Sequence, residues 1–297
     1  MKELIMQKQE KPIKRGVTLF SYSEILNVCM TLEDCFKDMY DMGVSCIEIL
    51  AGHVENYPNP PASWIDNWFR LLDKYQMEPG NFGHWYDTRL YQDRYLNVDE
   101  SLPYLEADLK LANMLGFKTA RTKLTTVNRN CDPVPEWEKY LEKAIVLAEK
   151  YDVKMGSEVH MPTNLTTKHI QDYLNFIERT GTKHFGLTVD FGTFQNKFPE
   201  IAAKRKGQIR VNENPSKPED LKAVLPYTFC CHAKYNYMDE NFEEITIPYH
   251  EVLKVLIDGG WKGCLIGEYE GPNKTDPDFV YEQTHRHQIL LKRTLGY

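Results

Sequence analysis

The chain alternates short β-rich apolar runs with longer segments of helical period, and this alternation constrains the fold more than any other feature of the sequence. Gly, Pro, Asp or Asn residues separate the two kinds of segment. The apolar runs predict eight strands, which are Gly16–Phe20, Val44–Leu50, Pro79–Trp85, Phe117–Thr122, Val153–His160, Phe185–Asp190, Thr228–Lys234 and Gly263–Tyr269.

Helices are expected between these strands. Thr31-Leu-Glu-Asp has the pattern of a capping box, Ser63 is the expected cap of the next helix, and Pro135 suits a first helical turn. The other predicted helices are Asn97–Leu115, Pro135–Lys150, Thr166–Arg179, Pro248–Gly259 and Phe279–Leu295, with the least distinct one within Phe198–Leu225.

Eight strand-helix units in series imply parallel strands joined by right-handed crossovers, and such units close into a (β/α)8 TIM barrel. A doubly wound open sheet is the alternative. That fold would normally place a Gly-rich phosphate turn after the first strand, but Thr18-Leu-Phe-Ser-Tyr-Ser contains no glycine. Because such barrels reach about 250 residues, we expect one barrel domain over residues 15–297, preceded by a polar arm over residues 1–14.

Charge and composition exclude several classes of function. The chain has 43 acidic and 36 basic residues, a net charge of -7, which gives no general attraction to nucleic acid or anionic membranes. Met1–Arg15 lacks the apolar centre of a secretion signal, and no apolar run approaches the ~20 residues of a membrane helix. Seven cysteines without a C-x-x-C pair indicate free thiols. We therefore expect a cytoplasmic protein, forming an oligomer, that binds neither nucleic acid nor membranes.

Each of the last four predicted strands is apolar until it reaches an ionisable side chain at or near its end. These are Glu158, Asp190, His232 and Glu268, at spacings of 32, 42 and 36 residues, each roughly one strand-helix unit of a barrel. Three converging carboxylates and one imidazole would repel one another without a cation. The pattern therefore predicts one divalent metal ion. Oxygen-rich ligands with one nitrogen favour Mn²⁺, with Mg²⁺, Co²⁺ or Fe²⁺ as alternatives.

A second layer of polar residues follows from strand alternation, since residues two apart face the same side. His160, Lys234 and Glu270 should face the same side as the metal ligands. His160 is a candidate base, or else holds a loop. Lys234 and Glu270 are candidate substrate-binding residues, or else form a structural ion pair. Further candidates for substrate binding at earlier strand ends are Glu48, His84 and Lys123. The polar segment 204–218 is either a solvated loop or a lid or docking surface.

These residues resemble the sugar phosphate isomerase/epimerase superfamily of xylose-isomerase-like TIM barrels. The similarity extends from Gly16-Val-Thr-Leu-Phe-Ser-Tyr, through Gly43-Val-Ser-Cys-Ile-Glu48, to the four strand ends. The motifs that look most like the catalytic α subunit of C-glycoside deglycosidases are Glu158-Val-His-Met-Pro162, Cys231-His-Ala-Lys-Tyr235 and Glu268-Tyr-Glu-Gly271. The resemblance implies the same four metal ligands, Mn²⁺, a small β subunit, and carbon-carbon lyase activity on 3-oxo-glucosides.

Two reactions remain open, and both pass through an enolate stabilised by the metal. In the lyase, His160 or Glu158 removes the C2 proton of a 3-oxo-C-glycoside, and the aglycone leaves by β-elimination. In a sugar or sugar phosphate isomerase or epimerase, Glu158 and Glu268 move the proton through a cis-enediolate.

Three other functions are disfavoured. Asp190-Phe-Gly-Thr193 lacks the histidine of the D-x-G-H motif found in many isomerases, which disfavours simple isomerisation. A nuclease on the same fold would need more ligands and a basic face. A binding module that performs no chemistry would bury these carboxylates at a cost in stability.

Overall fold

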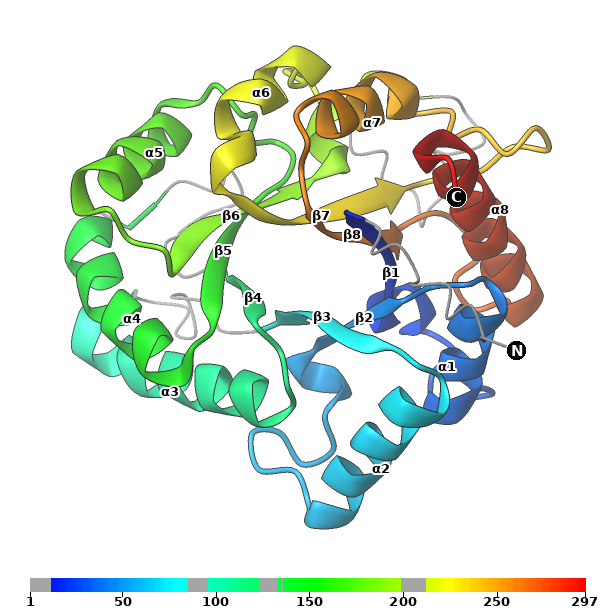
Figure 1. The fold of residues 1–297 in the computed structure, drawn as a ribbon, viewed down its shortest axis with the longest axis horizontal. Coiled ribbons are helices and arrows are strands. Elements are labelled where there is room, and N and C mark those ends of the chain that lie inside the picture. The colour runs from blue at the N-terminus through cyan, green and yellow to red at the C-terminus, as the bar shows by residue number, and fades with distance from the viewer. Residues whose placement is uncertain (1–11, 85–93, 95, 123–132, 135, 199–211) are drawn as a thin grey trace, which may run out of the picture.

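The computed structural model describes residues 12–84, 94, 96–122, 133–134, 136–198 and 212–297, and it confirms the predicted barrel (Figure 1). All eight strands are parallel and hydrogen-bond in chain order, and the pairing of β1 with β8 closes the barrel. The strands are β1 (Ile13–Thr18), β2 (Cys46–Leu50), β3 (Glu78–Gly83), β4 (Thr119–Thr122), β5 (Lys154–Val159), β6 (Phe185–Asp190), β7 (Thr228–Tyr235) and β8 (Gly263–Tyr269).

Helices surround the barrel on its outside (Figure 1). They are α1 (Leu32–Asp41), α2 (Ala62–Lys74), α3 (Val98–Met114), α4 (Trp137–Tyr151), α5 (Lys168–Thr180), α6 (Leu221–Val224), α7 (Tyr249–Asp258) and α8 (Pro277–Leu295). The helix expected within Phe198–Leu225 is reduced to the single turn of α6 in the described part of that segment.

One predicted helix cap is confirmed, another is wrong, and α8 begins two residues earlier than predicted. Thr31 caps α1, because its hydroxyl accepts the N–H of Asp34 at 3.1 Å while its own N–H reaches the Asp34 carboxylate at 2.8 Å. Ser63 is not a cap, since the extended backbone of Pro61 already precedes the first turn of α2. Helix α8 begins at Pro277 instead of Phe279, because the Asp276 carboxylate caps it. The predicted first-turn residue Pro135 lies outside the described residues.

The first strand also differs from its predicted range. It starts at Ile13, so the last two positions of the expected polar arm belong to the barrel, and residues 1–11 lie outside the described part of the chain. It ends at Thr18 instead of Phe20. The Thr18 hydroxyl accepts the N–H of Phe20 at 3.2 Å, which turns the backbone into the 3-10 helix η1 (Leu19–Tyr22).

The main hydrophobic core lies between the strands and the surrounding helices, where the outward-facing strand residues pack. Inside the barrel, a second small cluster of Cys46, Cys230 and Ile266 forms the floor beneath the strand ends. Six cysteines lie among the described residues, and all six are free thiols. None of the helices in the described ranges has the length and apolar character that crossing a membrane requires.

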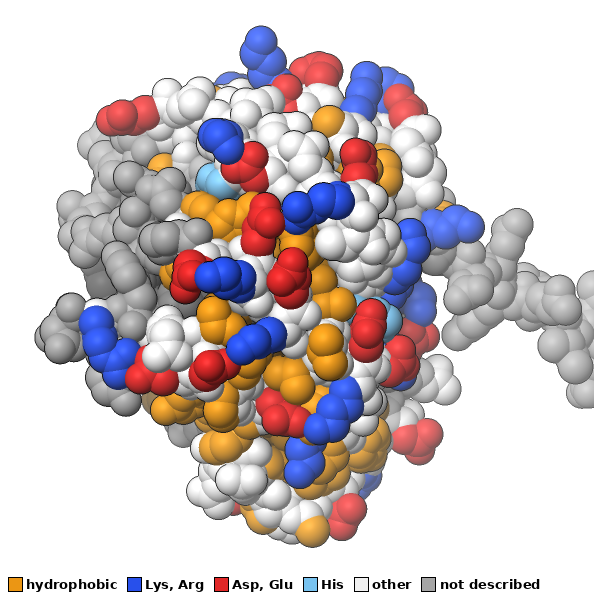
Figure 2. All heavy atoms as spheres, turned by 90° about the vertical axis from the view of Figure 1, so that its left-hand side faces the viewer, with side chains coloured by type: hydrophobic (Ala, Val, Ile, Leu, Met, Phe, Trp, Pro, Cys, Tyr) orange, Lys and Arg blue, Asp and Glu red, His pale blue; other side chains and the backbone are white. Residues whose placement is uncertain are grey.

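The outer surface over α3, α4 and α5 carries charges of both signs mixed with apolar side chains (Figure 2). Ion pairs join neighbouring helices here, with Lys143 to Asp99 at 2.6 Å between α4 and α3, and Arg179 to Glu138 at 2.9 Å between α5 and α4. Exposed pairs of this kind contribute little to stability, typically about 0–1 kcal/mol each. This face therefore offers no continuous basic surface to a polyanion.

Gly156 is a position where close approach of two strands requires glycine. A Cβ atom at this position would lie 2.4 Å from Oγ1 of Thr188 on β6. We expect Gly156→Ala to lower the free energy of unfolding by about 1–3 kcal/mol through overpacking. Thr188→Ala in the same chain should recover part of that loss, while Thr188→Ala alone should have a small effect, because Oγ1 has no hydrogen-bond partner. Chemical denaturation of the three variants tests this, and equal stability of Gly156→Ala and wild type would contradict it.

Candidate metal centre

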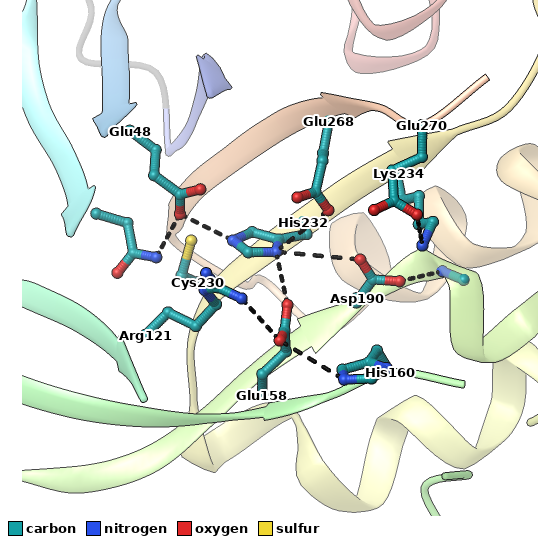
Figure 3. Close-up of polar contacts among 12 residues, drawn as sticks. Glu48, Arg121, Glu158, His160, Asp190, Cys230, His232, Lys234, Glu268 and Glu270 are labelled. Carbon is teal, nitrogen blue, oxygen red and sulfur yellow. Dashed lines mark hydrogen bonds and ion pairs between the residues drawn. The ribbon is translucent and has the colours of Figure 1, made fainter. Parts of the chain in front are cut away.

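The barrel brings the four strand-end residues together at the carboxyl ends of β5 to β8 (Figure 3). The imidazole of His232 lies at the centre, with its side chain fully buried. The carboxylate oxygens nearest to its Nδ1 atom are Oε1 of Glu158 at 3.2 Å, Oε2 of Glu268 at 3.6 Å and Oδ2 of Asp190 at 4.0 Å. All three carboxylate side chains are at most 10% exposed. Three acids therefore face one nitrogen atom inside the barrel.

The other side of the His232 ring is held by Glu48 on β2. The Nε2 atom lies 2.8 Å from Oε2 of Glu48, and that same oxygen accepts an N–H of Asn81 at 2.6 Å. A carboxylate only accepts hydrogen bonds, so Nε2 carries the proton. Nδ1 makes no hydrogen bond of acceptable geometry. Glu48, expected as a substrate-binding residue, thus fixes the ring so that Nδ1 faces the three acids.

Electrostatics at this point favour a positive charge. Burial lowers the pKa of His232, but the carboxylates of Glu48 and Glu268 outweigh burial and raise its pKa well above the usual value. Burial raises the pKa of Glu268 to about 8, with His232 opposing the change and Glu270 adding to it. Without a metal ion, the cluster therefore binds protons to reduce repulsion between its acids.

A divalent cation fits this donor set. One atom from each of Glu158, Asp190 and His232 lies within 4.8 Å of the others, and Glu268 joins them through its contact with His232. In an octahedral site with bonds of about 2.1 Å, adjacent ligand atoms are about 3.0 Å apart and opposite ones about 4.2 Å apart. The distances of 3.2, 3.6 and 4.0 Å from Nδ1 fall in this range. Carboxylates with one imidazole are donors suited to Mn²⁺, Mg²⁺, Co²⁺ or Fe²⁺.

Three further predicted site residues surround the four strand-end side chains. His160 follows β5, with Nδ1 2.6 Å from the carbonyl oxygen of Met161 and Nε2 3.8 Å from Oε2 of Glu158. Lys234 is buried and forms an ion pair with Glu270. Burial lowers the pKa of Lys234, but the nearby carboxylates, Glu270 first, outweigh it and raise the pKa. Lys234 is therefore a permanent cation beside the site and no base.

The remaining sequence candidates are His84, Lys123 and the segment 204–218. His84 is buried, and its Nδ1 lies 2.7 Å from the Asp108 carboxylate on α3, which also accepts the Tyr57 hydroxyl. Lys123 lies outside the described residues. Of the segment 204–218, residues 212–218 are described, and Asn212 donates to the carbonyl oxygen of Thr193 at 3.0 Å.

Sequence reasoning missed Arg121 and Asn81. Arg121 on β4 is buried, and its Nη1 atom donates to Oε2 of Glu158 at 2.8 Å. Asn81 holds Glu48. Lys123 was chosen as a strand-end residue, and Arg121 precedes it by two positions, so strand alternation applied to this strand would have selected Arg121 as well. Asn81 had no such signal, because the register between β2 and β3 shifts at Ile47/Glu48.

Comparison with known families places the chain in the xylose isomerase-like TIM barrel family. The sequence model of this family matches residues 36–291, and the chain therefore belongs to it. The match covers seven of the eight strands, including all those that carry the residues around His232.

Individual relatives are more distant. The 3'-dehydrocarminate deglycosidase alpha subunit of a Microbacterium species is 24% identical over 95% of this chain and 95% of its own. A C-glycoside deglycosidase alpha subunit of Arthrobacter globiformis is 24% identical over 95% and 92%. Among solved structures, D-psicose 3-epimerase of Clostridium cellulolyticum has a TM-score of 0.66 at 12% identity, covering 95% and 99% of the two chains. A 3-keto-D-glucoside 4-epimerase of E. coli has a TM-score of 0.59 at 13% identity, covering 95% and 99%. The structural likenesses show the shared fold.

Divalent metal binding should be strongly pH-dependent, because the metal must displace the protons that Glu268 and His232 hold in the metal-free protein. Both pKa values are raised, so these protons stabilise the metal-free protein at low pH. For Glu268 that stabilisation is lost as the pH rises through about 8, and for His232 it is lost as the pH rises through its raised pKa. Mn²⁺ affinity should therefore increase from pH 6 to 8, by roughly tenfold per pH unit for each proton displaced. Calorimetry in buffers of different ionisation enthalpy counts those protons.

Glu268→Gln is the matched variant for this measurement, because the amide keeps the shape of the side chain and cannot titrate. It should bind Mn²⁺ more weakly and release one proton fewer. A dissociation constant that does not change between pH 6 and 8, with no proton release, would show that these groups do not face a bound metal.

Proposed function

We propose that this protein is the catalytic subunit of a divalent-metal-dependent lyase that cleaves the carbon-carbon bond between sugar and aglycone in 3-oxo-C-glycosides. The observation that carries the proposal is the arrangement of three buried carboxylates around Nδ1 of His232, with His160 beside them. The two relatives named deglycosidase alpha subunits, aligned over 95% of this chain, support the substrate class. The relatives and solved structures named above share the broader description of an enzyme that acts on a sugar.

The metal ligands in this proposal are Glu158, Asp190, His232 and Glu268, and Mn²⁺ is the preferred ion. When bound, a divalent cation supplies Lewis acidity that stabilises the negative charge of an enolate. Lys234 and Glu270 are assigned to the sugar hydroxyl groups. Lys234, kept protonated by its neighbours, adds a fixed positive charge to that side of the site.

His160 is the proposed base. The carbonyl oxygen of Met161 only accepts hydrogen bonds, so Nδ1 of His160 carries the ring proton and Nε2 presents its lone pair. Nε2 removes the C2 proton of the 3-oxo-glycoside, and the electron pair of that bond forms the C2–C3 double bond while the 3-oxo oxygen takes the negative charge. When the carbonyl group forms again, the electron pair of the C2–C3 double bond moves to form a C1–C2 double bond, and the C1–aglycone bond breaks. The aglycone leaves with the electron pair of the broken bond and takes up the proton that His160 removed, so the sugar product is a 1,2-unsaturated 3-oxo compound and the reaction consumes no net proton.

A sugar epimerase is the second candidate, and the specific observation that favours it is the position of two carboxylates. Glu158 and Glu268 approach Nδ1 of His232 from different strands, at 3.2 and 3.6 Å, so they could exchange a proton with opposite faces of an enediolate. The fold likeness to sugar 3-epimerases is consistent with this reaction. It would release no aglycone.

Turnover of a 3-oxo-C-glucoside in the presence of Mn²⁺ tests the proposed reaction. The purified chain should be assayed alone and with any small subunit that co-purifies with it, since both relatives are named alpha subunits. We expect release of free aglycone that stops when EDTA removes the metal. Free ketoses serve as the competing substrates. Epimerised sugar without aglycone release would instead establish the second candidate.

Replacement of His160 separates the two reactions. We expect His160→Ala to lower kcat for aglycone release by roughly 10²–10⁴-fold, the usual contribution of a general base. The matched control is His250→Ala on α7, whose side chain is 57% exposed and paired with Glu243, and which should leave kcat unchanged. A His160→Ala protein with nearly full activity would assign proton removal to the carboxylates.

A further inference from the structure

Arg121 is a buried cation inside the barrel whose function the proposed reaction does not explain. It lies on β4, and its side chain is 10% exposed. Its Nη1 atom donates to Oε2 of Glu158 at 2.8 Å, and the Glu158 side chain is itself only 5% exposed. Burying a guanidinium group costs several kcal/mol unless a partner compensates it. Its presence beside the predicted metal ligands therefore requires a specific role.

The contacts of Arg121 show that it serves the site and not the scaffold. Within the described residues, Glu158 is the one hydrogen-bond acceptor of Arg121, and its Nε atom has no partner. The contacts of Arg15 differ from those of Arg121. Arg15 is also a buried arginine, but it lies on the outer side of the barrel wall. Its guanidinium donates to Oε1 of Gln288 at 2.9 Å and to the carbonyl oxygen of Gly43 at 2.8 Å, and so ties strands to helix and loop.

The two oxygens of Glu158 consequently face different partners (Figure 3). Oε2 receives the N–H of Arg121, while Oε1 lies 3.2 Å from Nδ1 of His232. A charge-assisted hydrogen bond of this kind fixes both the distance and the rotation of a carboxylate. Oε1 is the oxygen that faces the other ligands.

The charge of the cluster leads to the same conclusion. The three ligand carboxylates and Glu48, when all are ionised, carry a charge of −4, and a divalent cation bound to a neutral imidazole would leave −2 in a buried place. The single positive charge of Arg121 halves that remainder. Its charge also interacts with Glu48 and Glu268, so it acts on the whole cluster.

We propose that Arg121 is a positioning residue that holds Glu158 as a one-oxygen metal ligand and reduces the excess negative charge of the loaded site. This inference rests on the proposed metal centre. It has a consequence for the reaction, because Oε2 of Glu158, the oxygen nearer to His160, is already engaged and is a poor acceptor for a substrate proton.

Mn²⁺ affinity measured without any sugar is the test, because it does not depend on which reaction the enzyme catalyses. We expect Arg121→Met to raise the Mn²⁺ dissociation constant by roughly 10–100-fold, the usual effect of losing a partner of a metal ligand. Arg121→Lys should lose less, since it keeps the charge but not the planar donor group. Arg15→Met is the matched control and should lower the unfolding temperature while leaving Mn²⁺ affinity unchanged.

If Arg121→Met folds poorly, chemical rescue by an added cation distinguishes a role of Arg121 in positioning Glu158 from a role in general stability. Guanidinium at millimolar concentration should restore part of the Mn²⁺ affinity of Arg121→Ala, and methylammonium should restore less. Wild-type affinity in both Arg121→Met and Arg121→Lys, with only the unfolding temperature lowered, would overturn the proposal. If the wild-type protein binds no Mn²⁺, the proposed metal centre itself is wrong. The wild-type measurement shows this before any variant is made.

Discussion

Repulsion among buried acids is the constraint on which the rest of this structure depends. The barrel closes so that four carboxylates converge on one imidazole, those of Glu48, Glu158, Asp190 and Glu268. Like charges at a few ångströms in a buried place cannot all stay ionised without compensation. The chain supplies Arg121 and Lys234, each paired with a carboxylate, and His232 provides a nitrogen atom where a further positive charge can bind. The arrangement of the site is thus determined by the need to balance the charge of these buried carboxylates.

The fold could be predicted almost completely because each strand is an apolar run of limited length followed by helical periodicity. Strands β6 and β8 have the bounds that the sequence predicts. Two of the errors arise where a single local hydrogen bond decides the outcome. Thr18 ends β1 early through its hydroxyl, and Asp276 starts α8 early through its carboxylate. Periodicity carries no information about bonds of this kind.

The part of the candidate site on β5 to β8 could be predicted from the sequence more completely than the part on β2 to β4. On β5 to β8 an ionisable residue ends each apolar run, so Glu158, Asp190, His232 and Glu268 stand out in the sequence. On β2 to β4 the pattern fails. Arg121 is the third residue of a strand of only four, and a register shift at β2 hides the pairing of Asn81 with Glu48. The two residues that support the ligands, Arg121 and Asn81, were therefore identified from their contacts.

The contacts that fix the His232 ring also affect how readily the site binds an ion. This ring is held at one nitrogen by Glu48 and surrounded at the other by acids, and Glu48 is in turn held by Asn81. A ring fixed in this way has little rotational entropy left to lose when an ion arrives. The metal-free protein then has a preorganised binding site. The main free-energy cost of metal binding is the dehydration of the cation. Selectivity among divalent cations would follow from how readily each one dehydrates.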